Sequence, residues 1–248
     1  MFARLKDLRA FPPLLSIAAL PRGRIGVVAP HPDDEVIGAG GAIALHAGRG
    51  DRVSVIVMTD GAAGDPESHA RGQIVEVRRR ESQAAGAVLG VASHEFVGRQ
   101  DGTLAPDAAT VAALAQLLAR ERCDLVYAPS PFECHPDHVA TAMIAAAACQ
   151  SLTAPPRLHL FEVNQQHLPS YLLDITPVLS QKAAALRCFR SQMAYVDIVA
   201  KTFGHNVGRA VNVSDASVTH IEGYLIAPSD FAGFLEQLAQ LLERVPKP

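Results

Sequence analysis

The sequence predicts an α/β protein of one domain, with a Rossmann-like, mostly parallel sheet that carries helices on both faces. Short apolar runs rich in β-branched residues alternate along the chain with longer segments of helical character. These runs are apolar along most of their length, which is typical of parallel strands buried on both sides. A chain of 248 residues, 49% hydrophobic and 19% charged, is also long enough to bury one sizeable core.

The first two thirds of the chain contain the clearest alternation. Strands are expected at residues 24–29, 52–58 and 124–129, with weaker candidates at 94–98 and 157–163. Helices are expected between them, at residues 36–48, 72–90, 107–121 and 138–152. Each helix follows a strand, as the crossover connections of a parallel sheet require.

The two ends of the chain are expected to complete the same domain. Residues 170–248 predict a strand at 171–175, helices near 177–190 and 195–210, a strand near 218–226 and a last helix at 229–244. Residues 1–23 are expected to form an N-terminal arm packed on a single domain of residues 24–248. An export signal is the less favoured interpretation of the arm, because Asp7, Pro12 and Pro13 interrupt its basic and apolar parts.

Composition excludes several classes of function. A net charge of −3 without a basic stripe argues against nucleic acid as a partner. No apolar run approaches 18 residues, so no membrane-spanning segment is expected. The four cysteines form no C-x-x-C pair, and we interpret them as reduced thiols of a cytoplasmic protein. The expected partner is a small molecule.

Two charged motifs each follow a predicted strand. The first, "PHPDDE", contains His31 and Asp34 three residues apart, and the second, "ECHPDH", contains His135 and His138 at the start of a helix. Carboxylates crowded at the end of a buried strand need hydrogen-bond donors or a metal ion. The carboxyl ends of parallel strands share one edge of the sheet. Two imidazoles and one carboxylate from two such ends predict a three-ligand zinc site with one open position, the pattern of a catalytic zinc.

The motifs "PHPDDEVIGAGG" and "HPDH" resemble those of the PIG-L/LmbE-like zinc-dependent de-N-acetylases. The resemblance continues through "VRRRESQAAGAVLG" (77–90), "GRQDG" (98–102), "DITPVLSQKAAAL" (174–186), "SQ" (191–192) and "HIEGYLI" (220–226), and so covers nearly the whole chain from Arg24. It implies one zinc ion per chain, bound by His31, Asp34 and His138. It also implies that Asp33 is the general base, and that His135 faces the developing oxyanion and is oriented by Asp137. A protonated His135 would stabilise this oxyanion together with the zinc ion.

Several residues allow two interpretations. Arg78 aligns with a family arginine directed toward the substrate, but it can also belong to a solvated "RRR" helix face paired with Glu76 and Glu81. Asp101 is either a loop cap or a hydrogen-bonding group of the substrate pocket. Glu35 is expected to satisfy backbone donors. Gly38, Gly40 and Gly41 are expected to allow close helix packing rather than to bind phosphate.

The sequence also departs from the family at two positions expected to shape the pocket. Glu133 stands where some relatives have an aromatic residue, and Phe189 where relatives often have histidine. The family's fold and zinc chemistry are therefore expected to hold better than any particular substrate.

The resulting hypothesis is a zinc-dependent hydrolase that removes the N-acetyl group from an N-acetylglucosamine-type sugar conjugate and releases acetate. A zinc amidase acting on a non-sugar N-acyl compound and a catalytically silent metal- or nucleotide-binding module are the alternatives. The sequence leaves the oligomeric state open, and the family resemblance allows a homo-oligomer because family members are often oligomeric. Whether His135 or Asp33 protonates the leaving amine is left open by the sequence.

Overall fold

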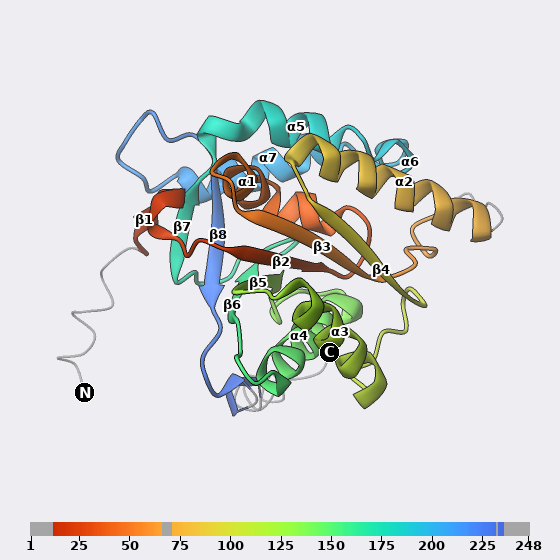
Figure 1. Cartoon of the computed structure of the whole chain (residues 1–248). Helices are drawn as coiled ribbons and strands as arrows, with labels where there is room; N and C mark the ends of the chain where they lie inside the picture. The colour runs from red at the N-terminus through yellow and green to blue at the C-terminus, as the bar shows by residue number, and fades with distance from the viewer. Residues whose placement is uncertain (1–11, 66–70, 232, 236–248) are drawn as a thin grey trace, which may run out of the picture.

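An eight-stranded sheet lies between two layers of helices in a computed structural model that describes residues 12–65, 71–231 and 233–235 (Figure 1). The strands are β1 (Leu14–Leu15), β2 (Arg24–Ala29), β3 (Arg52–Thr59), β4 (Ser93–Arg99), β5 (Leu125–Pro129), β6 (Arg157–Phe161), β7 (Tyr171–Asp174) and β8 (Ile221–Ile226). Their order across the sheet is β1-β7-β8-β6-β5-β2-β3-β4. All neighbouring pairs are parallel except those of β8, which runs antiparallel to β6 and β7. The predicted fold class is confirmed.

The helices divide between the two faces of the sheet. They are α1 (Asp34–Gly48), α2 (Arg71–Leu89), α3 (Ala108–Glu121), α4 (Pro136–Ser151), α5 (Leu179–Leu186), α6 (Arg190–Met193) and α7 (Ile198–Ala210), with short 3₁₀ turns η3 (Ile17–Ala19) and η4 (Thr176–Val178). Figure 1 shows α3 and α4 below the sheet and the other helices above it. Each face carries its own cluster of buried apolar side chains, so the sheet separates two cores.

Helix α1 packs unusually close to the sheet and to the C-terminal part of the chain. A Cβ atom added at Gly38 would lie 2.2 Å from Cδ2 of Phe161, and one added at Gly41 would lie 2.3 Å from Cγ2 of Ile175. Real Cβ atoms do not approach so closely, so these two positions accept only glycine without rearrangement. The glycines therefore permit close packing, as the sequence indicated.

The ends of the chain differ in detail from the predicted elements. Residues 14–15 of the expected arm pair in parallel with Leu172–Leu173 and so extend the sheet by one short strand. The predicted helix near 177–190 begins as the turn η4, which contains Pro177, and is interrupted at Phe189 before α6. The last predicted helix is helical at residue 231 and at 233–235, and its remainder lies outside the described residues.

The order of the strands brings the two charged motifs together. From β2 the chain moves outward through β3 and β4, and later returns to place β5 on the other side of β2. Val27 is paired with Tyr127, so β2 and β5 end at the same level, at Ala29 and Pro129. Such a switch point is where ligands bind in open α/β sheets.

Two further expectations concern the whole molecule. None of the helices in the described ranges is long and apolar enough to cross a membrane. All four cysteines are free thiols.

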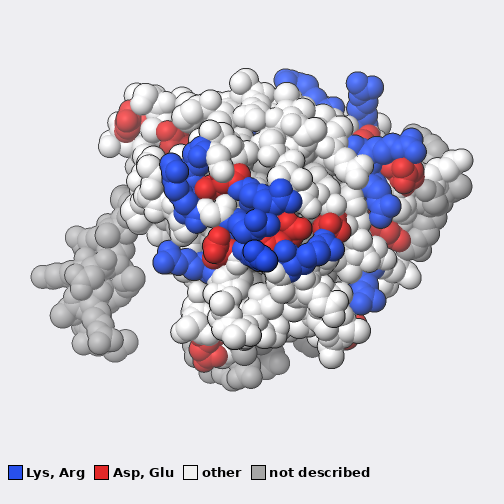
Figure 2. Space-filling model, in the orientation of Figure 1, with Lys and Arg blue, Asp and Glu red and all other residues white. Residues whose placement is uncertain are grey.

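On the face seen in Figure 2, acidic and basic side chains lie intermixed rather than in separate areas. This intermixing agrees with the absence of a basic stripe from the sequence.

Candidate metal centre and active site

Asp33 has a strained backbone at the start of α1. Its φ is 137°, a region that residues with a side chain rarely adopt. Glu35 stabilises this turn, because its Oε2 accepts a hydrogen bond from the N–H of Asp33 at 2.9 Å while its Oε1 accepts one from Ser82 at 2.6 Å. Local strain that the surroundings hold in place is common at functional sites.

Arg78 fixes the same turn from α2. Its Nη2 donates to the carbonyl of Pro32 at 2.9 Å and to Oδ2 of Asp33 at 3.1 Å, and its Nη1 donates to the carbonyl of Gly61 at 2.7 Å. The residue is buried, with 3% of its surface exposed. Arg78 therefore does not belong to a solvated helix face, and its nearest role is to position Asp33.

Asp34 lies between His31 and His138. Its Oδ2 is 3.0 Å from Nδ1 of His31 and 3.2 Å from Nε2 of His138. Both separations are near the roughly 3.3 Å expected between two ligand atoms of one tetrahedral zinc ion bound at 2.0–2.1 Å. Asp34 thus contacts both of the imidazoles that are predicted to bind zinc together with it.

The other nitrogen of each imidazole faces a second carboxylate. Nε2 of His31 lies 3.1 Å from Oδ1 of Asp101 and 3.2 Å from Oδ2 of Asp137. Nδ1 of His138 is buried without a well-formed hydrogen bond and lies 3.5 Å from Oε2 of Glu133. Metal-binding histidines usually present one nitrogen to the metal and the other to a carboxylate or carbonyl. The donor set and its surroundings therefore fit a zinc ion.

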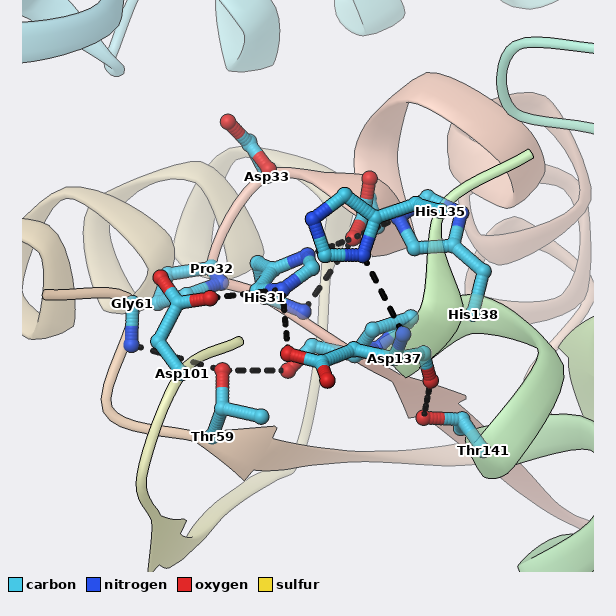
Figure 3. A network of polar contacts seen from close by, with 12 residues as sticks. His31, Pro32, Asp33, Thr59, Gly61, Asp101, His135, Asp137, His138 and Thr141 are labelled. Carbon is cyan, nitrogen blue, oxygen red and sulfur yellow. Dashed lines mark hydrogen bonds and ion pairs between the residues drawn. The ribbon is translucent and has the colours of Figure 1, made fainter. Parts of the chain in front are cut away.

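His135 completes the group of imidazoles. Donor atoms of His31, His135 and His138 all lie within 4.8 Å of one another, as do those of His31, Asp101 and Asp137. Figure 3 shows the three rings close together, with Asp101 and Asp137 beside His31. Nδ1 of His135 accepts a hydrogen bond from the N–H of Asp137 at 3.2 Å, so in the neutral ring the proton is on Nε2.

The charges of the site are strongly coupled. Burial alone would lower the pKa of His31, but Asp101, Asp137 and Asp34 raise it to about 12. Burial also opposes the charge of His138, whereas Asp34 and Glu133 raise its pKa to about 9. The pKa of Asp34 is held well below its usual range by His138 and His31, against the effect of burial. The excess of carboxylates around His31 and His138 favours the binding of a cation at this site.

The pKa values of Asp33 and His135, two residues with predicted catalytic roles, are shifted in opposite directions. Burial raises the pKa of Asp33 to about 6, while the charge of Arg78 opposes the rise. Burial, His31 and His138 lower the pKa of His135, so its ring is neutral near pH 7. A neutral His135 differs from the protonated imidazole expected from the sequence, and it donates through Nε2–H instead.

Asp137 makes different contacts from those expected. We expected its side chain to orient His135, but the carboxylate contacts His31 and accepts the N–H groups of Gly102 at 2.7 Å and Leu104 at 3.0 Å. Its only hydrogen bond to His135 uses its backbone N–H. The Asp137 carboxylate therefore orients His31, and a helix-start aspartate in a sequence does not reveal which neighbour it will face.

Two cavities meet at Asp33. One, of about 240 Å³, is lined by His31, Asp33, Ala63, Gly64, Arg78, Asp101, His135 and Gln192. The other, of about 370 Å³, is lined by Asp33, Asp34, Ile37, Val163, Asn164, Gln192, Val196, Ile198, Lys201, Thr202 and His205. Asp33 and Gln192 belong to both walls. Asp101 therefore lies in a pocket wall, where it also accepts the N–H of Ala63 at 2.9 Å.

Glu133 is the residue whose importance the sequence showed least clearly. Its carboxylate accepts the N–H groups of Val163 at 2.8 Å, Asn164 at 3.0 Å and Gln165 at 3.3 Å, and it also faces His138. It thus connects a candidate metal ligand to a loop that lines the larger cavity. The signal in the sequence was its position two residues before His135, in the short segment between a buried strand and a helix.

The chain is similar to the PIG-L family, described as GlcNAc-PI de-N-acetylase, whose model matches residues 26–149. A 4-oxalmesaconate hydratase of Pseudomonas putida is 30% identical over 223 residues, which cover 79% of this chain and 86% of the relative. A diacetylchitobiose deacetylase of Thermococcus kodakarensis is 28% identical over 182 residues, which cover 66% of this chain and 68% of the relative.

The similarity extends to three dimensions. The structure of the N,N'-diacetylchitobiose deacetylase from Pyrococcus horikoshii, in complex with an inhibitor, superposes with a TM-score of 0.73. It is 27% identical to this chain, and the match covers 84% of both chains. The segment matched by the family model contains both charged motifs and all the residues described above from His31 to His138.

Proposed function

The chain belongs to the PIG-L family of de-N-acetylases, and on this premise we propose that it removes the N-acetyl group from an N-acetylglucosamine-type sugar conjugate with the help of one zinc ion. The observation that carries the proposal is the position of Asp34 between His31 and His138, directly beside Asp33. The deacetylases of diacetylchitobiose among its relatives support a sugar amide as the substrate.

His31, Asp34 and His138 would hold the zinc ion through Nδ1, Oδ2 and Nε2. When bound, zinc lowers the pKa of a water molecule and polarises the amide carbonyl. Asp33 is the general base that accepts the proton from the attacking water. Arg78 and Glu35 hold Asp33 in place for this transfer.

His135 is the donor for the oxyanion. With Nδ1 occupied by the N–H of Asp137, the neutral ring presents Nε2–H, and a donor of this kind typically contributes 10²–10³ in rate. As water adds and the C–N bond breaks, the amine needs a proton. Asp33 gained one in the first step, so we assign the protonation of the leaving nitrogen to Asp33.

Acetate release from a panel of N-acetylglucosamine conjugates and simple acyl amides tests this proposal. The panel is run with added zinc, after chelation, and with Asp33→Asn, with Asp215→Asn as a control for loss of an exposed carboxylate outside the site. We expect release from a sugar amide that chelation and Asp33→Asn both abolish and that Asp215→Asn leaves unchanged. Near-full turnover by Asp33→Asn with zinc bound would refute the assigned base. Release only from non-sugar amides would favour the amidase alternative.

One observation favours a second candidate function. The relative from Pseudomonas putida, 30% identical over most of both chains, is described as a 4-oxalmesaconate hydratase, and a hydratase adds water to its substrate instead of hydrolysing an amide. The same base and metal could activate water for either reaction. Loss of ultraviolet absorbance from conjugated unsaturated carboxylates, without acetate release from any amide, would establish the hydratase instead.

The proposal also includes the remaining expectations from the sequence. We infer a small-molecule substrate, because the relatives named above act on small molecules. A homo-oligomeric state and a cytoplasmic location remain part of the proposal, and size-exclusion chromatography with light scattering tests the first of them.

A further inference from the structure

Gln192 and Asp33 are the two residues that belong to the walls of both cavities. A bound amide consists of an acyl half and an amine half, and its nitrogen joins the two. When each cavity holds one half of the amide, the nitrogen lies at the junction of the cavities, beside Asp33 and Gln192. The proposed mechanism gives Asp33 a role at this junction and gives none to Gln192.

The side-chain amide of Gln192 is held in one orientation by its nitrogen. Nε2 donates to the carbonyl of Gly64 at 3.0 Å and to Oγ of Ser191 at 3.2 Å. Oγ of Ser191 in turn donates to Oε2 of Glu81 at 2.6 Å. A carbonyl can only accept, and Ser191 has already given its one proton to Glu81, so both partners of Gln192 require the NH₂ group. The oxygen and nitrogen of the Gln192 amide therefore cannot exchange places.

Oε1 of Gln192 is the acceptor that this arrangement leaves available. The side chain is partly exposed, and within residues 12–65, 71–231 and 233–235 no donor forms a hydrogen bond to this oxygen. In the proposed mechanism His135 serves the carbonyl oxygen of the substrate, whereas the amide N–H loses its water on binding and needs a new acceptor. Asp33 is unsuited to this task, because it accepts the proton of the attacking water.

We propose that Oε1 of Gln192 accepts the N–H of the scissile amide and thereby makes the enzyme selective for N-acetyl over O-acetyl groups. In an ester an oxygen replaces the N–H, so two acceptors would face each other without a proton between them. A site built to hydrogen-bond one group of a substrate discriminates against an analogue that lacks this group. The same contact orients the nitrogen beside Asp33. The inference rests on the proposed function and adds a specificity-determining residue to it.

Kinetics with a matched pair of substrates tests the inference. The methyl glycoside of N-acetylglucosamine and methyl 2-O-acetylglucoside differ only in the N–H or oxygen that links the acetyl group to the sugar. Gln192→Met keeps the length of the side chain and removes the acceptor oxygen. Leaving the N–H unpaired costs a factor of about ten. We expect Gln192→Met to lower kcat/KM about tenfold for the amide and less than twofold for the ester.

Gln181→Met is the matched control. Gln181 also donates through its Nε2 to a backbone carbonyl, that of Val88 at 2.8 Å, but it lines neither cavity. This variant should leave both values of kcat/KM unchanged. An equal loss for amide and ester in Gln192→Met would mean that the residue only supports the shape of the site, and it would overturn the inference.

A binding measurement tests the same contact without turnover. Two methyl glucosides carry a methylphosphonyl group at position 2, linked through nitrogen in one and through oxygen in the other, and both resemble the tetrahedral adduct of an acetyl group. In calorimetry with the zinc-loaded protein, the nitrogen-linked compound should bind about tenfold more tightly than the oxygen-linked one. In Gln192→Met the two affinities should agree within twofold. Equal affinities for the unaltered protein, or binding of neither compound, would overturn the inference.

The two measurements separate this inference from the proposed function. If no amide is hydrolysed but the difference in affinity is present and depends on Gln192, the proposed function fails and the contact stands. If amides are hydrolysed but the difference in affinity is absent or independent of Gln192, the contact fails and the proposed function stands.

Discussion

Nη2 of Arg78 lies 3.1 Å from Oδ2 of Asp33, and the same nitrogen donates to the carbonyl of Pro32. One guanidinium group on α2 thus holds both the side chain and the preceding peptide of a residue whose φ is 137°. Through Gly61 it also holds the loop after β3. The geometry of the proposed general base is therefore set by a residue 45 positions away in the sequence.

Arg78→Lys should reduce activity although it keeps the charge. Lysine has donors on a single nitrogen and cannot reproduce the planar fork that reaches Gly61, Pro32 and Asp33 together. Since a displacement of about 1 Å at a reacting group can cost about 10² in rate, we expect kcat to fall by about this factor. Arg80→Lys, whose arginine pairs with Glu76 on the surface, is the control. Equal activity of the two variants would show that Arg78 does not position Asp33.

Much of this arrangement could be predicted from the sequence, because it depends on patterns that are local in the chain. Alternating strands and helices fix the parallel sheet, and the carboxyl ends of its strands bring His31 and His138 to one edge. The positive φ of Asp33 and the burial of Arg78 depend on tertiary contacts. From the sequence alone, an arginine within an "RRR" run is expected to be solvated. Its burial follows only from its tertiary contact with the loop that contains Gly61.

Glu133→Gln should weaken metal binding. The carboxylate accepts three backbone N–H groups and faces Nδ1 of His138, whereas glutamine would turn an NH₂ group toward donors. Loss of such an outer carboxylate typically costs 10–100-fold in metal affinity. Competition with a chelator of known zinc affinity measures the effect. Glu95→Gln, which removes a carboxylate paired with Arg120 away from the site, should bind zinc like the unaltered protein. Unchanged zinc affinity in Glu133→Gln would contradict the assigned role.

The stability of the metal-free protein should fall as the pH drops from about 6.5 to about 4, in part because of His159. Burial, with a contribution from Arg157, lowers the pKa of His159 to about 4, so the unfolded state binds a proton in this range that the folded state does not. The unfolding free energy lost through this one residue is at most roughly 3 kcal/mol. Denaturant unfolding at several pH values, with chelator present, should show a smaller decrease for His159→Gln. Parallel curves for the two proteins would rule out this contribution.

A fully buried ion pair connects α5 to the middle of α1. Nζ of Lys182 donates to Oε1 of Glu222 at 2.7 Å and to the carbonyl of Ile37, a residue of the larger cavity, at 2.9 Å. Glu222 also accepts the N–H groups of Gly41 and Ala42. The pair thus binds the helix that begins at the candidate metal site and fixes its position against the C-terminal part of the chain.

Lys182→Met should be strongly destabilising, and a second substitution should recover part of the loss. Removing one partner of a buried pair leaves the other charge unpaired and typically costs about 3–5 kcal/mol. In Lys182→Met with Glu222→Gln no charge remains, although the second acceptor oxygen for the α1 N–H groups is lost. Unfolding free energies of both single variants and the double variant give the coupling between the two side chains. We expect the double variant to be more stable than Lys182→Met alone. Additive losses would mean that the pair contributes no interaction of its own.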